Sequence, residues 1–216
     1  MIVLGLTGSI GMGKSTAAAV LRALRLPLFD ADQAVHRLLA PNGAAVRPVA
    51  AAFPDVRAGS GGIDRELLGR RVFADPAALS RLEAIIHPLV DRAEQRFLAQ
   101  AHGRRAPIAV LDIPLLFETG SERRCDYVLV VSAPKFLQHQ RVLRRPGMSE
   151  DRLAAILAQQ MPDAEKQRRA DFVVRTGLDR RQSLHRLRAI VRLLRGPSPG
   201  CGKRQRRRTA WHRRRG

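Results

Sequence analysis

The stretch Gly8-Ser9-Ile10-Gly11-Met12-Gly13-Lys14-Ser15 follows an apolar run, residues 2–7, and precedes a run of helix-forming residues, 15–24. It satisfies the pattern G-x-x-x-x-G-K-[ST], which requires a strand before it and a helix after it. Glycines let successive backbone N–H groups turn inward around phosphate oxygens, and the N-terminus of the helix adds a partial positive charge. The stretch therefore predicts a phosphate-binding loop between a buried strand and a helix.

This loop predicts a nucleotide site that also uses a metal ion. We expect Lys14 to reach the β- and γ-phosphates and the Ser15 hydroxyl to coordinate Mg²⁺. The alternative is a glycine-rich turn with a chance lysine, which does not explain the flanking strand and helix. The predicted nucleotide-binding residues are Gly8, Ser9, Ile10, Gly11, Met12, Gly13, Lys14, Ser15 and Thr16.

Further strands and helices alternate along the chain. Short apolar runs bounded by breakers or charge predict strands at residues 28–29, 107–111, 127–131 and 172–174. A last helix is expected over residues 179–195, with one apolar stripe formed by Leu184, Leu187, Ile190, Val191 and Leu194. This alternation predicts an α/β protein with three layers and a parallel sheet.

Residues 33–105 lack a strand pattern. Apolar residues recur there at helical spacing between several prolines, which predicts a helical insertion. A residue that precedes proline is pushed out of the helical conformation. We therefore expect His87-Pro88 to break a helix of the insertion.

A charged helical stretch, residues 136–169, lies between the last two predicted strands and is interrupted at Pro146-Gly147. A hinge at this point would let the stretch move over a bound ligand. Arg141 and Arg145 are spaced to share one helical face, and the repulsion between two such cations favours an anion between them. A solvated basic face is the alternative.

Acidic residues follow two of the predicted strands. Asp30 and Asp32 come directly after the second strand, at the sheet edge where ligands bind in parallel sheets. If the segment is extended, both project to one side, and either could accept a proton from an attacking hydroxyl. Helix capping is the alternative. Asp112 ends the third strand, where assistance to Mg²⁺ through water and a plain turn are equally compatible with the sequence.

The overall composition excludes a chain that is disordered throughout. Its 216 residues are 45% hydrophobic and 27% charged, enough to bury a core. The formal net charge of +20 favours anionic partners but does not choose among nucleotides, nucleic acids and acidic membranes. Almost all basic residues are arginine, which genomic base composition explains as well as phosphate binding does.

Other features suggest a soluble protein of the cytoplasm. Cys125 and Cys201 have neither metal-ligand nor disulfide spacing, which suits a reducing compartment. The apolar start is too short for a signal peptide, and no stretch has the length of a membrane span, so we expect no membrane partner. Residues 196–216 form a basic tail without a possible core, and we expect a disordered extension rather than a nucleic-acid site built on Trp211 and His212.

Taken in order, several motifs resemble the dephospho-CoA kinase family over roughly residues 1–195. They are the phosphate loop with Thr16, Asp30-Ala31-Asp32, His87-Pro88-Leu89, Pro114-Leu115-Leu116-Phe117-Glu118, then Gln138, Arg141, Arg145, Gln160 and Ala170-Asp171. The resemblance implies a P-loop NTPase fold with a helical acceptor-binding insertion and a helical lid. It also implies transfer of the γ-phosphoryl group of ATP to the ribose 3′-hydroxyl of dephospho-CoA.

The resemblance implies roles for individual segments and residues. Residues 1–32 and 106–195 match the nucleotide-binding core, 33–105 the CoA-binding insertion and 136–160 the lid. Asp32 matches the general base, Lys14, Arg141 and Arg145 the other catalytic residues, and Ser15 the Mg²⁺ contact. Asp112 is the second candidate for the metal, from its position at the end of a strand. The acceptor-binding residues are Asp32, His87, Pro114 and Leu115.

The chain also departs from the family pattern. Pro146 stands where the family usually has an acidic residue, and Arg175-Thr176-Gly177 replaces an acid-Asn pattern near the adenine pocket, which leaves the base contacts unassigned. A kinase of the nucleoside monophosphate type with another acceptor is the alternative. The chain lacks the Asn-Lys-x-Asp signature of a GTPase.

Overall fold

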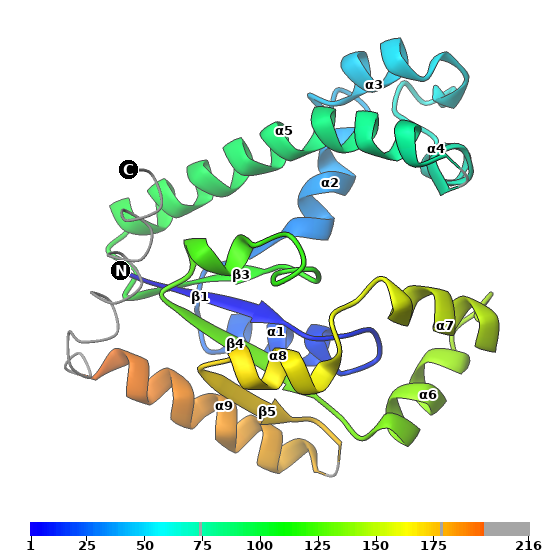
Figure 1. The fold of residues 1–216 in the computed structure, drawn as a ribbon. Helices are drawn as coiled ribbons and strands as arrows, with labels where there is room; N and C mark the ends of the chain where they lie inside the picture. The colour runs from blue at the N-terminus through cyan, green and yellow to red at the C-terminus, as the bar shows by residue number, and fades with distance from the viewer. Residues whose placement is uncertain (74, 178, 197–216) are drawn as a thin grey trace, which may run out of the picture. The chain divides into compact units, whose positions relative to one another are not determined.

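The computed structural model describes residues 1–73, 75–177 and 179–196. The chain divides into two compact units (Figure 1). The core unit comprises Met1–Leu28 and the described residues from Arg104 onward, and the helical unit comprises Phe29–Gly103. The prediction for the basic tail falls on residues 197–216, which lie outside the described residues.

The sheet has five strands in the order β2-β3-β1-β4-β5. The pairs β1–β3, β1–β4 and β4–β5 are parallel. All five predicted strands are confirmed, and their bounds are Ile2–Thr7 (β1), Leu28–Asp30 (β2), Ile108–Asp112 (β3), Tyr127–Ser132 (β4) and Phe172–Arg175 (β5). In the register of β1 with β3, Leu6 lies beside Asp112, so the residue that ends β3 sits next to the end of β1.

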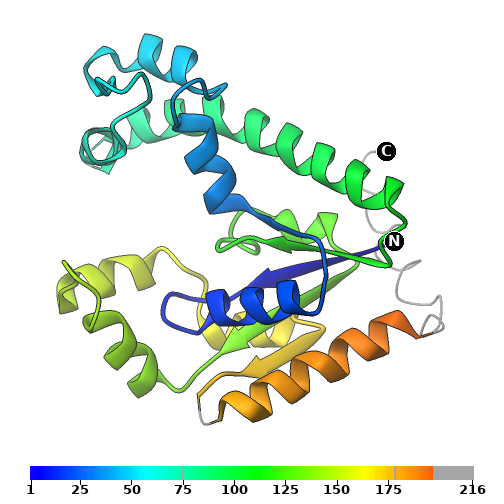
Figure 2. The same cartoon turned by 180° about the vertical axis from the view of Figure 1, so that it is seen from behind.

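Two helices cover one face of the sheet in the core unit, as Figures 1 and 2 show: α1 (Lys14–Ala23) and α9 (Arg180–Arg195). Helix α8 (Asp163–Arg169) covers the other face and contacts β4. Alternate side chains of the strands, among them Leu4, Leu6, Val110 and Leu129, pack against apolar side chains of the helices, among them Leu187 and Ile190 of α9. The predicted three-layer α/β fold is confirmed.

The opposite face of β1 is approached closely by the segment after β3. A Cβ atom added at Gly5 would lie 2.8 Å from Cys125 Sγ and 3.0 Å from Leu116 Cδ2, closer than normal packing allows. Glycine at this position therefore lets the segment between β3 and β4, which includes the short helix η2 (Ser121–Arg124), lie directly on the sheet.

Between β4 and β5 the chain forms α6 (Lys135–Leu143), α7 (Glu150–Ala158) and α8. The predicted interruption at Pro146-Gly147 is confirmed, because it lies between α6 and α7. Helix α7 begins with Ser149 as its cap, whose side chain accepts a hydrogen bond from the Arg152 N–H.

The helical unit packs a core of its own. Its helices are α2 (Ala31–Leu39), α3 (Val46–Ala52), η1 (Pro54–Val56), α4 (Arg65–Phe73) and α5 (Pro76–Gly103). Helix α5 contacts α2, α3 and α4. The buried side chains between them include Leu39, Val49, Phe53, Leu68 and Ile86. The helical character predicted for this range from apolar spacing is thus present.

The prediction that His87-Pro88 breaks a helix is wrong, because α5 runs through both residues. A proline inside a helix removes one backbone hydrogen bond and costs roughly 3 kcal/mol. Packing of α5 against three other helices, with Ile86 buried, compensates for this cost. Although α5 has 28 residues, neither it nor any other described helix is apolar enough to cross a bilayer.

We predict that Leu187→Ala lowers the free energy of unfolding by about 2–5 kcal/mol, because Leu187 is 2% exposed in the core beneath α9 and its truncation leaves a cavity. The matched control is Leu193→Ala on the same helix, where the side chain is 52% exposed. This variant should change stability by no more than about 0.5 kcal/mol. Urea denaturation measures both, and equal losses would contradict the assigned orientation of α9.

Candidate active site

The loop between β1 and α1 ends in a left-handed residue. Gly13 has φ 91° and ψ 21° and forms the N-cap of α1. A Cβ atom added there would lie 2.8 Å from Thr176 Oγ1, so both conformation and space favour glycine. Within the described chain, no side chain caps α1 and its first turn has no acidic residue. The N–H groups at this helix end are therefore suited to an anionic ligand.

Lys14 and Asp112 form an ion pair beside this loop. Lys14 Nζ lies 2.8 Å from Asp112 Oδ1, and the side chains are 18% and 3% exposed. Helix α1 provides the lysine, while Asp112 ends β3 next to the end of β1. The structure thus brings together two predicted site residues that are far apart in the sequence. A buried carboxylate next to an ammonium group gives the site both an acceptor and a donor.

The segment after β3 presents another pair of predicted residues. The Thr7 hydroxyl donates a hydrogen bond to the Pro114 carbonyl over 2.9 Å, which fixes this segment to the end of β1. Leu115 is 39% exposed, whereas Leu116 and Phe117 are buried. Leu115 is therefore available to a ligand, while its neighbours hold the segment in the core.

Two glutamines hold the phosphate-binding loop at Ile10. Gln138 of α6 donates from Nε2 to the Ile10 carbonyl over 2.9 Å. The Ile10 N–H donates to Gln160 Oε1, just after α7, over 3.1 Å. Both backbone groups of one loop residue are thus bound by side chains from the stretch predicted as a lid. Pattern reasoning gave these glutamines no role, because nothing in the sequence indicates contacts over such separations.

Arg141 also contacts the loop. Its guanidinium donates to the carbonyls of Gly11 over 3.4 Å and Thr176 over 2.9 Å. Arg145 differs from the prediction: α6 ends at Leu143, so Arg145 lies past the helix and is exposed. The argument that Arg141 and Arg145 share a helical face at this spacing is wrong, because the chain turns before Pro146.

Pattern reasoning assigned no contact to Thr176, which it named only within a departure from the family pattern, and none to the buried Lys166. The Thr176 hydroxyl donates to the Met12 carbonyl over 2.6 Å. Lys166 is fully buried, and its Nζ lies 2.9 Å from Glu118 Oε1 in an ion pair without hydrogen-bond geometry. Glu118 Oε1 also accepts the Met161 N–H over 2.8 Å. Glu118 therefore joins the segment after β3 to the chain between α7 and α8.

The remaining predicted residues belong to the helical unit. Asp30 caps α2, because its Oδ1 accepts the Gln33 N–H over 3.0 Å, and Asp32 lies in the first helical turn. The assumption of an extended Asp30–Asp32 segment is therefore wrong, since a helix begins between the two. Asp32 is exposed, and so is His87 in α5. Their roles in the reaction stay predictions.

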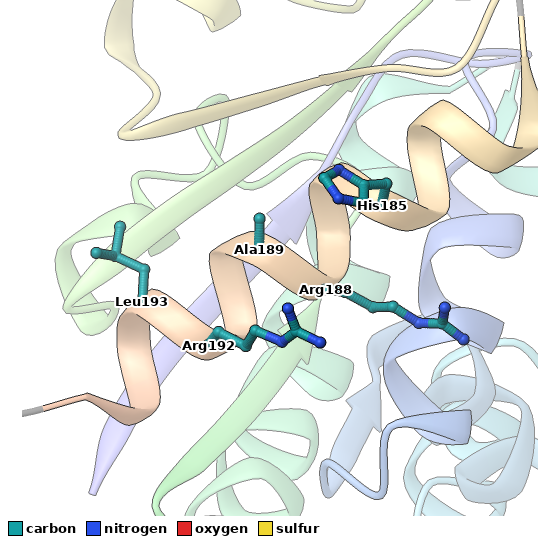
Figure 3. Close-up of a pocket in the computed structure, with 5 residues that line it drawn as sticks. All are labelled: His185, Arg188, Ala189, Arg192 and Leu193. Carbon is teal, nitrogen blue, oxygen red and sulfur yellow. The ribbon is translucent and has the colours of Figure 1, made fainter.

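A hollow of about 600 Å³ lies on the outer face of α9, lined by His185, Arg188, Ala189, Arg192 and Leu193 (Figure 3). None of the predicted site residues is among these lining residues. The phosphate-binding loop, rather than this hollow, therefore marks the candidate active site.

Comparison with known proteins gives a consistent result. The family model for dephospho-CoA kinase matches residues 2–179. A dephospho-CoA kinase from Paramagnetospirillum magneticum is 60% identical over 201 residues, which cover 93% of this chain and 94% of that protein. One from Rhodospirillum rubrum is 56% identical over 194 residues, with 90% and 92% covered.

Solved structures agree with this match. The crystal structure of TT1252 from Thermus thermophilus superposes with a TM-score of 0.77 at 38% identity, covering 88% of this chain and 96% of that one. A dephospho-CoA kinase from Campylobacter jejuni gives a TM-score of 0.65 at 26% identity, with 88% and 95% covered. A phosphate-binding loop with a paired lysine, a matching family model and relatives above half identity lead to one conclusion: the chain belongs to the dephospho-CoA kinase family.

Proposed function

We propose that the protein transfers the γ-phosphoryl group of ATP to the ribose 3′-hydroxyl of dephospho-CoA, giving coenzyme A and ADP. The observation that carries this proposal is the Lys14–Asp112 pair at the uncapped end of α1, in a chain of this family. Free backbone donors and a lysine there suit a polyphosphate. Two cysteines with neither disulfide nor metal-ligand spacing suit a reducing compartment, and we place the reaction in the cytoplasm.

On the nucleotide side, the loop from Gly8 to Thr16 binds the phosphates and Lys14 stabilises the β- and γ-phosphates. Ser15 and Asp112 would hold Mg²⁺, since both offer oxygen donors at one end of the sheet. The described residues contain no cluster of three His, Cys, Asp or Glu side chains, which fits an ion bound largely by phosphates and water. Such an ion neutralises charge on the phosphates.

On the acceptor side, Asp32 is the proposed general base. Its exposed carboxylate accepts the proton of the 3′-hydroxyl while that oxygen bonds to the γ-phosphorus. The bond from this phosphorus to the bridging oxygen of ADP breaks, and ADP leaves with the electron pair. The exposure of Asp32 in the first turn of α2 supports this role, because its carboxylate is accessible to a hydroxyl group.

The proposed roles of the other predicted residues follow from their chemistry. Arg141 and Arg145 stabilise charge on the transferring phosphoryl group. His87, Pro114 and Leu115 bind dephospho-CoA, and the exposure of His87 and Leu115 supports this assignment. The helical insertion supplies the surface for the rest of this bulky acceptor.

We predict that the protein incubated with ATP, Mg²⁺ and dephospho-CoA forms coenzyme A and ADP in equal amounts, as chromatography with mass detection measures. Coenzyme A itself should not accept a phosphoryl group, because its 3′-hydroxyl is already phosphorylated. Phosphorylation of AMP instead of dephospho-CoA would favour the nucleoside monophosphate kinase alternative.

Replacing the proposed base should remove turnover and leave nucleotide binding intact. We expect Asp32→Asn to lower kcat on the order of 10²-fold or more, because a general base contributes at least that much. Asp30→Asn is the matched control, since asparagine also caps a helix. Steady-state rates and ADP titrations measure both effects. A larger loss in Asp30→Asn than in Asp32→Asn would assign the base to Asp30 instead.

Arg141→Ala should lower kcat on the order of 10³-fold, because the guanidinium that contacts the loop is the proposed source of transition-state stabilisation. Arg144→Ala, which removes an exposed arginine three residues further along, should stay within about twofold of the wild type. Single-turnover rates at saturating ATP separate this effect from binding. Equal rates for both variants would contradict the role of Arg141.

A further inference from the structure

Three consecutive carbonyl groups of the phosphate-binding loop are held by side chains from outside the loop. Gln138 Nε2 donates to the Ile10 carbonyl over 2.9 Å, and Arg141 Nη1 donates to the Gly11 carbonyl over 3.4 Å. The Thr176 hydroxyl donates to the Met12 carbonyl over 2.6 Å, the shortest of the three contacts. These contacts fix the peptide groups that supply the N–H donors of the loop.

Each of these contacts determines where a neighbouring N–H points. A peptide group is planar, and in the trans form its C=O and the following N–H point in opposite directions. The described chain contains no cis peptide bond. A carbonyl of Met12 directed at Thr176 therefore turns the N–H of Gly13 away from Thr176. Gly13 is the N-cap of α1, where an anion is expected to bind.

The other loop N–H groups are constrained in different ways. The Met12 N–H donates within the loop to the Ser9 carbonyl over 3.1 Å, so the contact at the Gly11 carbonyl does not direct a donor to a ligand. The Ile10 N–H donates to Gln160 Oε1. The peptide between Met12 and Gly13 is therefore the one whose orientation depends most directly on the Thr176 hydroxyl.

Thr176 is itself held rigidly and also contacts Arg141. Thr176 directly follows β5, and its N–H donates to the carbonyl of Ser132 in β4 over 2.8 Å. Its own carbonyl accepts Arg141 Nη2 over 2.9 Å. One residue thus connects the sheet, the phosphate-binding loop and an arginine of the segment after β4.

We propose that Thr176 is a positioning residue for nucleotide binding. Its hydroxyl orients the Met12–Gly13 peptide so that the Gly13 N–H faces the phosphates, and its carbonyl holds Arg141 beside the loop. The inference rests on the proposed function, because it assumes that the loop binds a nucleotide. It gives Thr176 a role that requires only its hydroxyl and its backbone.

The test compares Thr176→Val and Thr176→Ala, which lose the hydroxyl, with Thr176→Ser, which keeps it. The contact of Arg141 Nη2 to the Thr176 carbonyl remains in all three variants, whereas the 3.4 Å contact of Arg141 Nη1 to Thr176 Oγ1 is lost together with the hydroxyl and kept in Thr176→Ser. Loss of the hydroxyl leaves the Met12 carbonyl without its partner, so we expect the Kd of Mg²⁺-ADP to rise about tenfold in the valine and alanine variants. The KM for ATP should rise in parallel, while the KM for dephospho-CoA stays near that of the wild type. The serine variant should bind Mg²⁺-ADP like the wild type.

Calorimetric titration with Mg²⁺-ADP requires no acceptor, so it tests the role of Thr176 even if the wild type fails to make coenzyme A. Failure of the wild type with dephospho-CoA would contradict the proposed function alone. An unchanged Kd in both the valine and the alanine variant would overturn the inference. An equal rise in Thr176→Ser would also overturn it, because packing and not the hydroxyl would then be responsible.

Discussion

The arrangement of the core unit depends on the N-terminus of α1, where backbone N–H groups lack partners within the helix. In the part of the chain that the structure describes, no side chain caps this helix, so its first N–H groups need partners from elsewhere. β1 and β3 bring the loop and Asp112 to the same edge of the sheet, and the segment between β3 and β4 lies directly on Gly5. A sheet that is buried on both faces holds this helix end rigidly.

Charge is arranged in pairs around this end. Lys14 is paired with Asp112, whose side chain is 3% exposed, and the fully buried Lys166 lies against Glu118. Burial of a single charge would cost several kcal/mol, so the buried Asp112 carboxylate and the buried Lys166 ammonium group each depend on a partner of opposite charge. The two pairs have different positions: the first lies at the end of β1 beside the start of α1, whereas the second joins the segment after β3 to the chain between α7 and α8.

The segment between β4 and β5 contributes directly to the loop. Gln138, Arg141 and Gln160 bind its backbone from this segment, and Thr176 does so from the end of β5. Because the donors of the loop are backbone groups, their direction is set by whatever holds the carbonyls on the other side of each peptide. The direction of these backbone donors therefore depends on side chains that lie outside the loop.

The sequence by itself determined the strands, the phosphate-binding loop and the family, because each depends on local patterns: apolar runs, glycine spacing and a lysine at a helix start. Local patterns gave wrong predictions where the conformation depends on contacts between residues that are distant in the sequence. Pro88 stays inside α5 because three other helices pack against that helix, and Arg145 leaves the helical face because the chain turns after Leu143. Only the tertiary structure revealed the ion pair of Lys14 with Asp112 and the hydrogen bond from the Thr176 hydroxyl to the Met12 carbonyl. Parallel strand pairing brings together residues that are far apart in the sequence, and no sequence spacing predicts such contacts.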